Sequence, residues 1–346
     1  MAVAEDIEKH AEPGAGNHIT RRVLGSPTLR LAGRRLVAAL PVLWGVTFLT
    51  FVVMNLLPGD AAQELLGANA TPAEVHQLEI QLHLNEPFWV RYGTWLDGAL
   101  HGNLGTSLTN GENVSTILGA RLPVTAELLA YAFIGSVVLA IGVAILAARK
   151  PNGIADRLSM VVSMTGLSVA PYVLALVLIY IFAVRVQWFP AIGYTSLSAD
   201  PVQNIRSLTL PAAALGFALF SVYTRLLRAD IVEQMQREDY IVTARAKGVP
   251  PWRILLRHAL PNSMFGLLTL VGLNLGALIG AVAIIEPIFS LPGVGAILIS
   301  SITNHDVPVV EGIVVVFAVV VVLASLLADV LYATLDPRIR YERSAS

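Results

Sequence analysis

The sequence contains no cysteine, and only 14% of its 346 residues are charged. The lack of cysteine excludes disulfide bonds, thiolate metal sites and a thiol nucleophile. The shortage of charge excludes an ordinary soluble domain, in which about a quarter of the residues are charged. Hydrophobic residues instead make up 55% of the chain. These proportions predict a membrane protein.

The motifs of several enzyme classes are also missing. The chain has no H-E-x-x-H, no G-x-S-x-G and no P-loop, which are signatures of zinc proteases, serine hydrolases and nucleotide hydrolases. No carboxylate lies in the middle of an apolar run, since Glu127 and Glu286 fall at helix ends and Asp329 near the end of the last helix. An ion-driven carrier normally needs carboxylates or broken helices near the bilayer midplane. We therefore predict that the chain is not an enzyme, holds no metal or cofactor, and draws any energy for work from elsewhere.

Six apolar runs are long enough, or nearly so, to cross a hydrocarbon core, which takes about 20 helical residues. Pro41, Pro171 and Pro211 are expected to interrupt helices. The runs are residues 36–57, 128–148, 158–184, 207–224, 263–285 and 312–328.

The basic residues are sorted by region. Of 23 Lys and Arg residues, 19 lie in the N-terminal tail, the links 149–157 and 225–257, and the C-terminal tail. The positive-inside rule places these segments in the cytoplasm. The predicted fold is therefore an all-α membrane protein with six transmembrane helices and both termini cytoplasmic.

The first external connection, residues 58–122, is too long for a turn. Thr71 and Glu74 match a T-x-x-E capping box, which predicts a short amphipathic helix. Three residues on its other side have a spacing that a metal site could use, but a solvated face is favoured because no further strong ligand is evident. They are His76, Glu79 and His83.

The fifth apolar run holds a G-x-x-x-G-x-x-x-G row, formed by Gly272, Gly276 and Gly280. Small residues at this spacing let a second helix approach to backbone contact. The row predicts a packing face, either within the chain or against a second subunit.

The basic link before the fifth run contains "TARAKGVPPWRILLRHALPN", residues 243–262. Gly248 followed by two prolines predicts a helix, a sharp break and a second helix. Trp252 at the tip would suit the groove of another protein, with Leu255, Leu256 and Leu260 anchoring the second helix. A basic helix lying on anionic lipid is the alternative.

This link resembles a known family. Gly248, nine intervening residues and the tetrapeptide 258–261 are similar to the cytoplasmic EAA loop of bacterial ABC importer permeases, although residues 242–244 are Val-Thr-Ala where that loop has Glu-Ala-Ala. The stretches "DYIVTARAKG", "EPIFSLPGVG", "NHDVPVVEG" and "ADVLYATLDPR" resemble the dipeptide, oligopeptide and nickel branch of that family. The long first external connection and the ending resemble its B-type subunit.

The resemblance implies a multi-pass subunit of a type I ABC importer in the bacterial plasma (inner) membrane. A second, C-type permease of six helices would complete the pathway, and an external substrate-binding protein would deliver oligopeptides or dipeptides. Two cytoplasmic ABC ATPases would bind ATP and Mg and dock on the coupling loop; nucleic acid is not among the expected partners. The same architecture also imports nickel, glutathione or haem. A non-ABC membrane enzyme or scaffold is the alternative from another class.

The predicted organisation is a cytoplasmic tail over residues 1–34, a permease domain over 35–340 and a C-terminal tail over 341–346. The permease domain includes the coupling loop over 230–262. The glycine row is assigned to helix packing or to the subunit interface. The residues assigned to ATPase docking are Ala244, Arg245, Ala246, Lys247, Gly248, Trp252, Arg253, His258, Leu260 and Pro261.

Overall fold

The computed structural model describes residues 27–56, 61–67 and 69–335. The predicted C-terminal tail and residues 1–26 of the predicted N-terminal tail lie outside this part of the chain. The described residues contain no strand, and a single isolated bridge joins Thr106 to Asn113. The predicted all-α class is confirmed.

The described residues of the six apolar runs are helical, except for a break in the third run at residues 169–170. Four helices are long and apolar enough to cross a membrane, namely α2, α6, α9 and α14, and α7 with α8 and η1 forms a further pair bent by 113°. The fifth run lies in α12, a helix of 29 residues. The bounds are α2 (Pro27–Leu56), α6 (Val114–Ala148), α7 (Ile154–Ser168), α8 (Pro171–Leu178), the π-helix η1 (Ile179–Arg185), α9 (Pro201–Arg237), α12 (Leu260–Ile288) and α14 (Val307–Leu335).

The three membrane prolines behave differently. Pro171 divides the third run, because the residue before a proline avoids the α region and Ala170 is accordingly extended, with φ −65° and ψ 141°. Pro41 and Pro211 lie inside α2 and α9 without ending them. The expected interruption is therefore confirmed at Pro171 and wrong at the other two positions, where the flanking turns keep the helix continuous.

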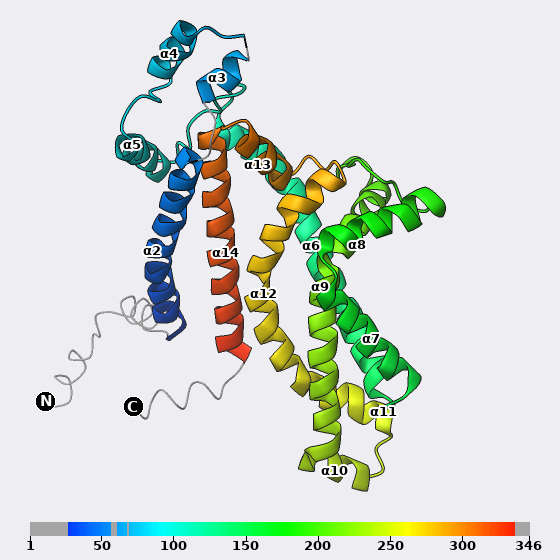
Figure 1. Ribbon diagram of the computed structural model, residues 1–346. Helices are drawn as coiled ribbons and strands as arrows, with labels where there is room; N and C mark the ends of the chain where they lie inside the picture. The colour runs from blue at the N-terminus through cyan, green and yellow to red at the C-terminus, as the bar shows by residue number, and fades with distance from the viewer. Residues whose placement is uncertain (1–26, 57–60, 68, 336–346) are drawn as a thin grey trace, which may run out of the picture.

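The shorter helices gather at the two ends of the long ones (Figure 1). One end carries α3 (Ala61–Leu66), α4 (Pro72–Gln81), α5 (Phe88–Leu100) and α13 (Val294–Thr303), and is called here the far end. The other end carries α10 (Asp239–Ala246) and α11 (Pro251–Ile254), and is called the loop end; the π-helix η2 (Leu255–Ala259) leads from α11 into α12. α2 packs on α14, and α12 packs on both α14 and α9.

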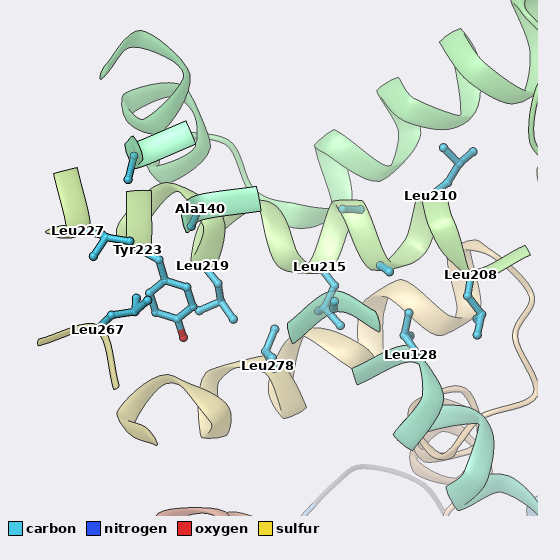
Figure 2. Packing of buried hydrophobic residues seen from close by; sticks show 14 of the residues in the cluster. Leu128, Ala140, Leu208, Leu210, Leu215, Leu219, Tyr223, Leu227, Leu267 and Leu278 are labelled. Carbon is cyan, nitrogen blue, oxygen red and sulfur yellow. The ribbon is translucent and has the colours of Figure 1, made fainter. Parts of the chain in front are cut away.

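The main core lies between α6 and α9 (Figure 2). The two backbones come close together at Gly216, where a Cβ atom would lie 2.6 Å from the carbonyl oxygen of Ala132. Close backbone approach through small residues is the usual basis of helix packing in membranes. Above and below this contact the core is filled by larger side chains, among them Leu128, Leu208, Leu215, Leu219 and Tyr223.

The short helix predicted in the first connection is confirmed as α4, although none of its residues is buried. The amide of Thr71 donates to the Glu74 carboxylate at 2.8 Å, and the Glu74 amide donates back to the Thr71 hydroxyl at 3.4 Å. The Thr71 amide and hydroxyl, which both donate to the Glu74 carboxylate, hold the pKa of Glu74 below its usual range. His83 lies past the end of the helix, with φ +56°, so its expected register with Glu79 is lost. Within the described residues no three carboxylates or histidines lie close enough together to hold a metal ion.

Candidate functional site

The segment between α9 and α12 folds back on itself at the loop end. The Tyr240 hydroxyl donates to the side chain of Gln234, near the end of α9. Asn262, in the first turn of α12, donates its amide to the Tyr240 oxygen at 2.9 Å. One tyrosine therefore ties the helix that enters the loop to the helix that leaves it.

The break at Gly248 is a Schellman motif, a common way to end a helix. The Gly248 amide donates to the Arg245 carbonyl at 2.9 Å, and the Val249 amide donates to the Ala244 carbonyl at 3.1 Å. Gly248 has φ +76° and no atom within 4 Å of a built Cβ. Glycine is required here by the left-handed backbone and not by crowding. Pro251 then occupies the first turn of α11, as the sequence predicts.

One face of the loop is anchored and the other is open. Ile241 and Ala244 of α10 and Ile254 of α11 are buried in the main core cluster. Trp252 is 54% exposed at the tip, and Arg253 places its guanidinium 5.3 Å from the centre of the Trp252 ring. The loop therefore presents an amphipathic, positively charged knob on a rigid support.

The predicted docking residues divide between these two faces. The exposed ones are Arg245, Ala246, Lys247, Gly248, Trp252, Arg253 and Pro261; His258 and Leu260 are half-buried and Ala244 is buried.

Two residues in the loop differ from their expected roles. Leu256 is 43% exposed, so its prediction as an anchor is wrong. The π-helix over Leu255–Ala259 changes the angular spacing of side chains, which turns Leu256 outward while Leu255 stays buried. Arg245 donates from Nη2 to the Met235 carbonyl at 2.7 Å, so it holds α10 against α9 besides contributing positive charge.

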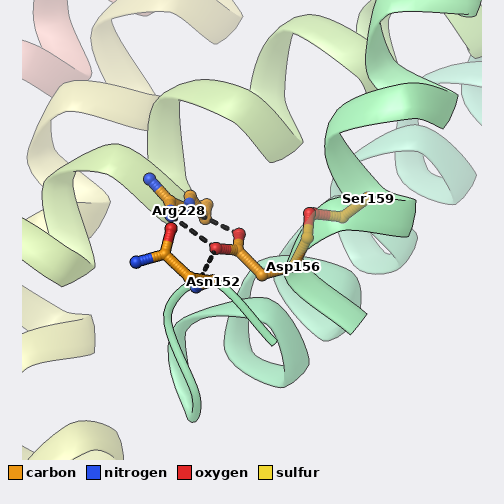
Figure 3. A network of polar contacts seen from close by, with 4 residues as sticks. All are labelled: Asn152, Asp156, Ser159 and Arg228. Carbon is orange, nitrogen blue, oxygen red and sulfur yellow. Dashed lines mark hydrogen bonds and ion pairs between the residues drawn. The ribbon is translucent and has the colours of Figure 1, made fainter. Parts of the chain in front are cut away.

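An ion pair that sequence reasoning missed lies between α7 and α9, towards the loop end (Figure 3). Arg228 donates from Nε and Nη2 to the two carboxylate oxygens of Asp156 at 2.8 and 2.7 Å. The backbone amide of Asn152 donates to the same carboxylate at 2.7 Å. The bidentate geometry fixes α7 and the 149–153 link to α9. No sequence signal could reveal it, because the partners stand 72 positions apart.

Two buried carboxylates organise the far end. Glu286, at the end of α12, accepts a hydrogen bond from the Thr125 hydroxyl at 2.6 Å and from the Ala296 amide at 3.1 Å. Asp306, between α13 and α14, accepts from the Ser107 hydroxyl and from the Leu108 amide at 3.1 Å. The first carboxylate fastens α6 and α13 to α12, and the second fastens the loop that precedes α6 to the start of α14.

The glycine row is only partly used inside the chain. A Cβ at Gly276 would meet Val321 of α14 at 3.6 Å, which is an ordinary contact, and a Cβ at Gly280 would meet nothing within 4 Å. The surroundings of Gly272 lie outside what the structure describes. The row therefore leaves room at Gly280 for an atom from outside the chain.

The chain matches two models of one protein family. The inner membrane component of binding-protein-dependent transport systems matches residues 140–341, and the N-terminal part of such membrane components matches residues 28–129. The first match covers more than half of the chain and includes the whole loop. The protein belongs to this family: it is a multi-pass permease subunit of the bacterial inner membrane, and it is not an enzyme.

Curated relatives agree with the family and with the branch that the motifs resemble. The chain is 36% identical over 334 residues to the dipeptide transport system permease protein DppB of Alkalihalophilus pseudofirmus, covering 90% of this chain and 100% of the relative. It is 35% identical over 311 residues to the oligopeptide permease AppB of Bacillus subtilis, and 33% identical over 309 residues to the glutathione permease GsiC of Escherichia coli. Both alignments cover 89% of this chain and 98% of the relative.

Proposed function

We propose that this chain is one of two permease subunits of an ATP-driven importer of oligopeptides or dipeptides, and that the 243–262 segment docks on a cytoplasmic ATPase. A C-type permease completes the pathway, a second ATPase docks on that partner, and an external binding protein delivers the peptide. The chain itself performs no chemistry. It transmits motion between the docking loop and the far end.

The observation that carries this proposal is the contrast between the two faces of the loop. Ile254 and Leu255 are buried in the same core cluster as the α6 and α9 side chains, so a force on the loop reaches the membrane helices through packed atoms. Trp252 stands exposed beside Arg253 at the tip, and tryptophan and arginine are the residues most often dominant in protein interfaces. A helix that merely rests on lipid has no need of a capped, doubly anchored turn.

Glutathione import is the second candidate, favoured by the 33% identity to the glutathione permease GsiC over 89% of this chain. Glutathione is itself a small peptide, so the same pathway chemistry suits both substrates. Nickel and haem lack a comparable observation among the described residues, which contain no cluster of metal-ligating side chains.

The test is transport by the whole complex in proteoliposomes. The chain is co-expressed with a candidate C-type permease, two ABC ATPases and a substrate-binding protein, and ATP-dependent uptake of a labelled dipeptide, glutathione and nickel is compared. We expect the complex to import the dipeptide. Trp252→Ala is expected to lower both peptide uptake and ATPase co-purification at least tenfold, because truncating a central interface tryptophan costs about 2 kcal/mol or more. Trp89→Ala is the matched control, since Trp89 is also an exposed tryptophan, at 66% against 54% for Trp252, and lies at the far end.

Uptake of glutathione without the dipeptide would move the substrate assignment to the second candidate. Normal ATPase binding by Trp252→Ala, with a greater loss of uptake when Arg245 and Arg253 are both changed to glutamine, would instead identify the loop as a lipid-surface segment.

A further inference from the structure

A pocket of about 480 Å³ lies at the far end, between α6 and the connection that leads into α9. This far-end pocket falls within the size range of small-molecule sites, about 300–1,000 Å³. Among the described residues that line it, Glu127 alone carries a charge. The lining residues are Ala120, Pro123, Val124, Glu127, Tyr194, Ser196, Leu197 and Ser198.

Glu127 is held in place by a network that uses only one of its oxygens. The Tyr194 hydroxyl donates to Oε2 at 2.9 Å, and the Asn204 side-chain amide donates to the same oxygen at 2.8 Å. Asn204 is fully buried, donates also to the Thr195 carbonyl at 2.8 Å, and accepts from the Tyr131 hydroxyl at 2.9 Å. The carboxylate is thus oriented by three elements, as a binding group is when its partners are preorganised.

The network supplies donors but no positive charge. The ion pairs among the described residues do not include Glu127. Burial and the hydrogen bond to Glu127 raise the pKa of Tyr194 to about 12, so the phenol keeps its proton at neutral pH and remains a donor. A carboxylate has about four acceptor positions, and no hydrogen bond occupies Oε1 within the described part of the chain. Glu127 therefore faces the pocket as an acceptor without a countercharge.

We propose that the far-end pocket binds the terminal ammonium group of a peptide substrate, with Glu127 as the countercharge. An ammonium group offers three donors and no acceptor, which suits a free carboxylate oxygen beside neutral hydroxyls. A transition metal such as nickel is a poor occupant, because it prefers imidazole or thiolate ligands and the lining holds neither. The proposal rests on peptide import as the function of the chain and adds to it a selective feature for substrates with a free N-terminus.

The absence of cysteine from the chain allows a direct measurement of charge in the pocket. Ser198→Cys places a single thiol on the pocket wall. In the complete transporter, the thiol is modified in parallel with a cationic trimethylammonium thiosulfonate and an anionic sulfonate thiosulfonate, and the ratio of the two rates reports the local potential independently of thiol reactivity. We expect adding Glu127→Gln to lower the cation-to-anion ratio about tenfold, as expected for loss of a nearby unit charge at intermediate dielectric.

Two control variants accompany the measurement. Glu79→Gln removes a half-buried carboxylate from α4, outside the pocket lining, and is expected to leave the ratio unchanged. Glu127→Asp keeps the charge and is expected to stay within about twofold of the starting ratio, which separates loss of charge from loss of fold.

The occupant is tested by protection of the same thiol. Alanyl-alanine is expected to slow modification of Ser198→Cys, whereas N-acetyl-alanyl-alanine is not, and Glu127→Gln is expected to remove the protection. Equal protection by the two peptides, or protection that survives Glu127→Gln, overturns the proposal. A transporter that imports no peptide at all contradicts the proposed function instead, while the rate ratio still reports whether a cation site exists.

Discussion

Gly248 is the residue on which the shape of the docking loop depends. Its φ of +76° lies in the left-handed region that glycine adopts readily, and no neighbouring atom lies within 4 Å of a Cβ built at this position. A substitution here therefore strains the backbone without displacing any neighbour. Because backbone strain and steric crowding are separated at this position, substitutions of Gly248 test whether the function of the loop depends on its backbone conformation.

Gly248→Val is expected to abolish uptake and to reduce ATPase co-purification while the protein still inserts in the membrane. A β-branched residue in the left-handed region costs about 1–2 kcal/mol or more, and reopening the turn displaces Trp252. Gly248→Asn is the matched control, because asparagine tolerates positive φ, and it is expected to retain most of the activity. Equal loss in both variants would show that the glycine serves something other than the turn.

At this scale the sequence predicts what is local. A glycine followed by two prolines is enough to place the break, since their backbone preferences are intrinsic. The outward direction of Leu256 is not predictable in the same way, because it follows from a π-helix that no single residue demands. The sequence predicts that Glu127 lies at a helix end, and this is wrong, because α6 runs from Val114 to Ala148 and holds Glu127 in its interior. The orientation of Glu127 depends on Tyr194 and Asn204, which stand 67 and 77 positions away and which no sequence signal indicates.

Among the helices, α9 contacts several others and lies at the centre of the packing. It packs against α6, α7, α8 and α12, and its polar contacts lie at both ends. The apolar run 207–224 predicts only its central part, since the polar turns that extend it to Arg237 have no hydrophobic signal. Their helical state depends on capping, on contacts such as Arg228 with Asp156, and on packing of residues such as Ile231.

The Asp156–Arg228 pair is expected to behave as a coupled unit in a double-mutant cycle. Asp156→Ala should destabilise the protein by about 3 kcal/mol, because it leaves a largely buried guanidinium without its partner. Adding Arg228→Met should restore part of that loss, since two apolar side chains need no partner. Thermal unfolding of the purified protein in detergent measures both changes.

The exposed pair Arg237–Glu233, also on α9, provides the comparison. Its atoms lie 3.1 Å apart, but both side chains are more than half exposed, and exposed pairs contribute little. Breaking it should leave the unfolding midpoint almost unchanged. If the buried pair gave the same small and additive effects, its role in holding α7 to α9 would be excluded.

At the scale of the whole molecule, Gly280 is the open packing position among the glycines of the row whose surroundings the structure describes. Gly280→Leu is expected to leave the stability of the isolated chain unchanged, because nothing lies within 4 Å of a Cβ there, and to prevent co-purification of the partner permease. Gly276→Leu also meets Val321, so it is expected to disturb the chain and the complex together. An intact complex with Gly280→Leu would remove the row from the subunit interface.

The orientation in the membrane can be measured from the two ends of the same molecule. Ser115 lies exposed at the start of α6, and Val242 lies exposed in α10. Single cysteines at these positions are expected to react with an impermeant maleimide from opposite sides, with Ser115→Cys labelled in intact cells and Val242→Cys only after permeabilisation. Labelling of both in intact cells would contradict the orientation drawn from the basic segments.

The close contact between Gly216 and Ala132 gives α9 a fulcrum near its middle. A helix of 37 residues is about 55 Å long at 1.5 Å per residue. A tilt of about 5° around that contact swings each end by about 2 Å, in opposite directions. Asn204 rides on one arm of this lever and Arg228 on the other. We expect a rigid tilt of α9 about this contact to move Asn204, and with it one wall of the Glu127 pocket, in the direction opposite to the Arg228 end.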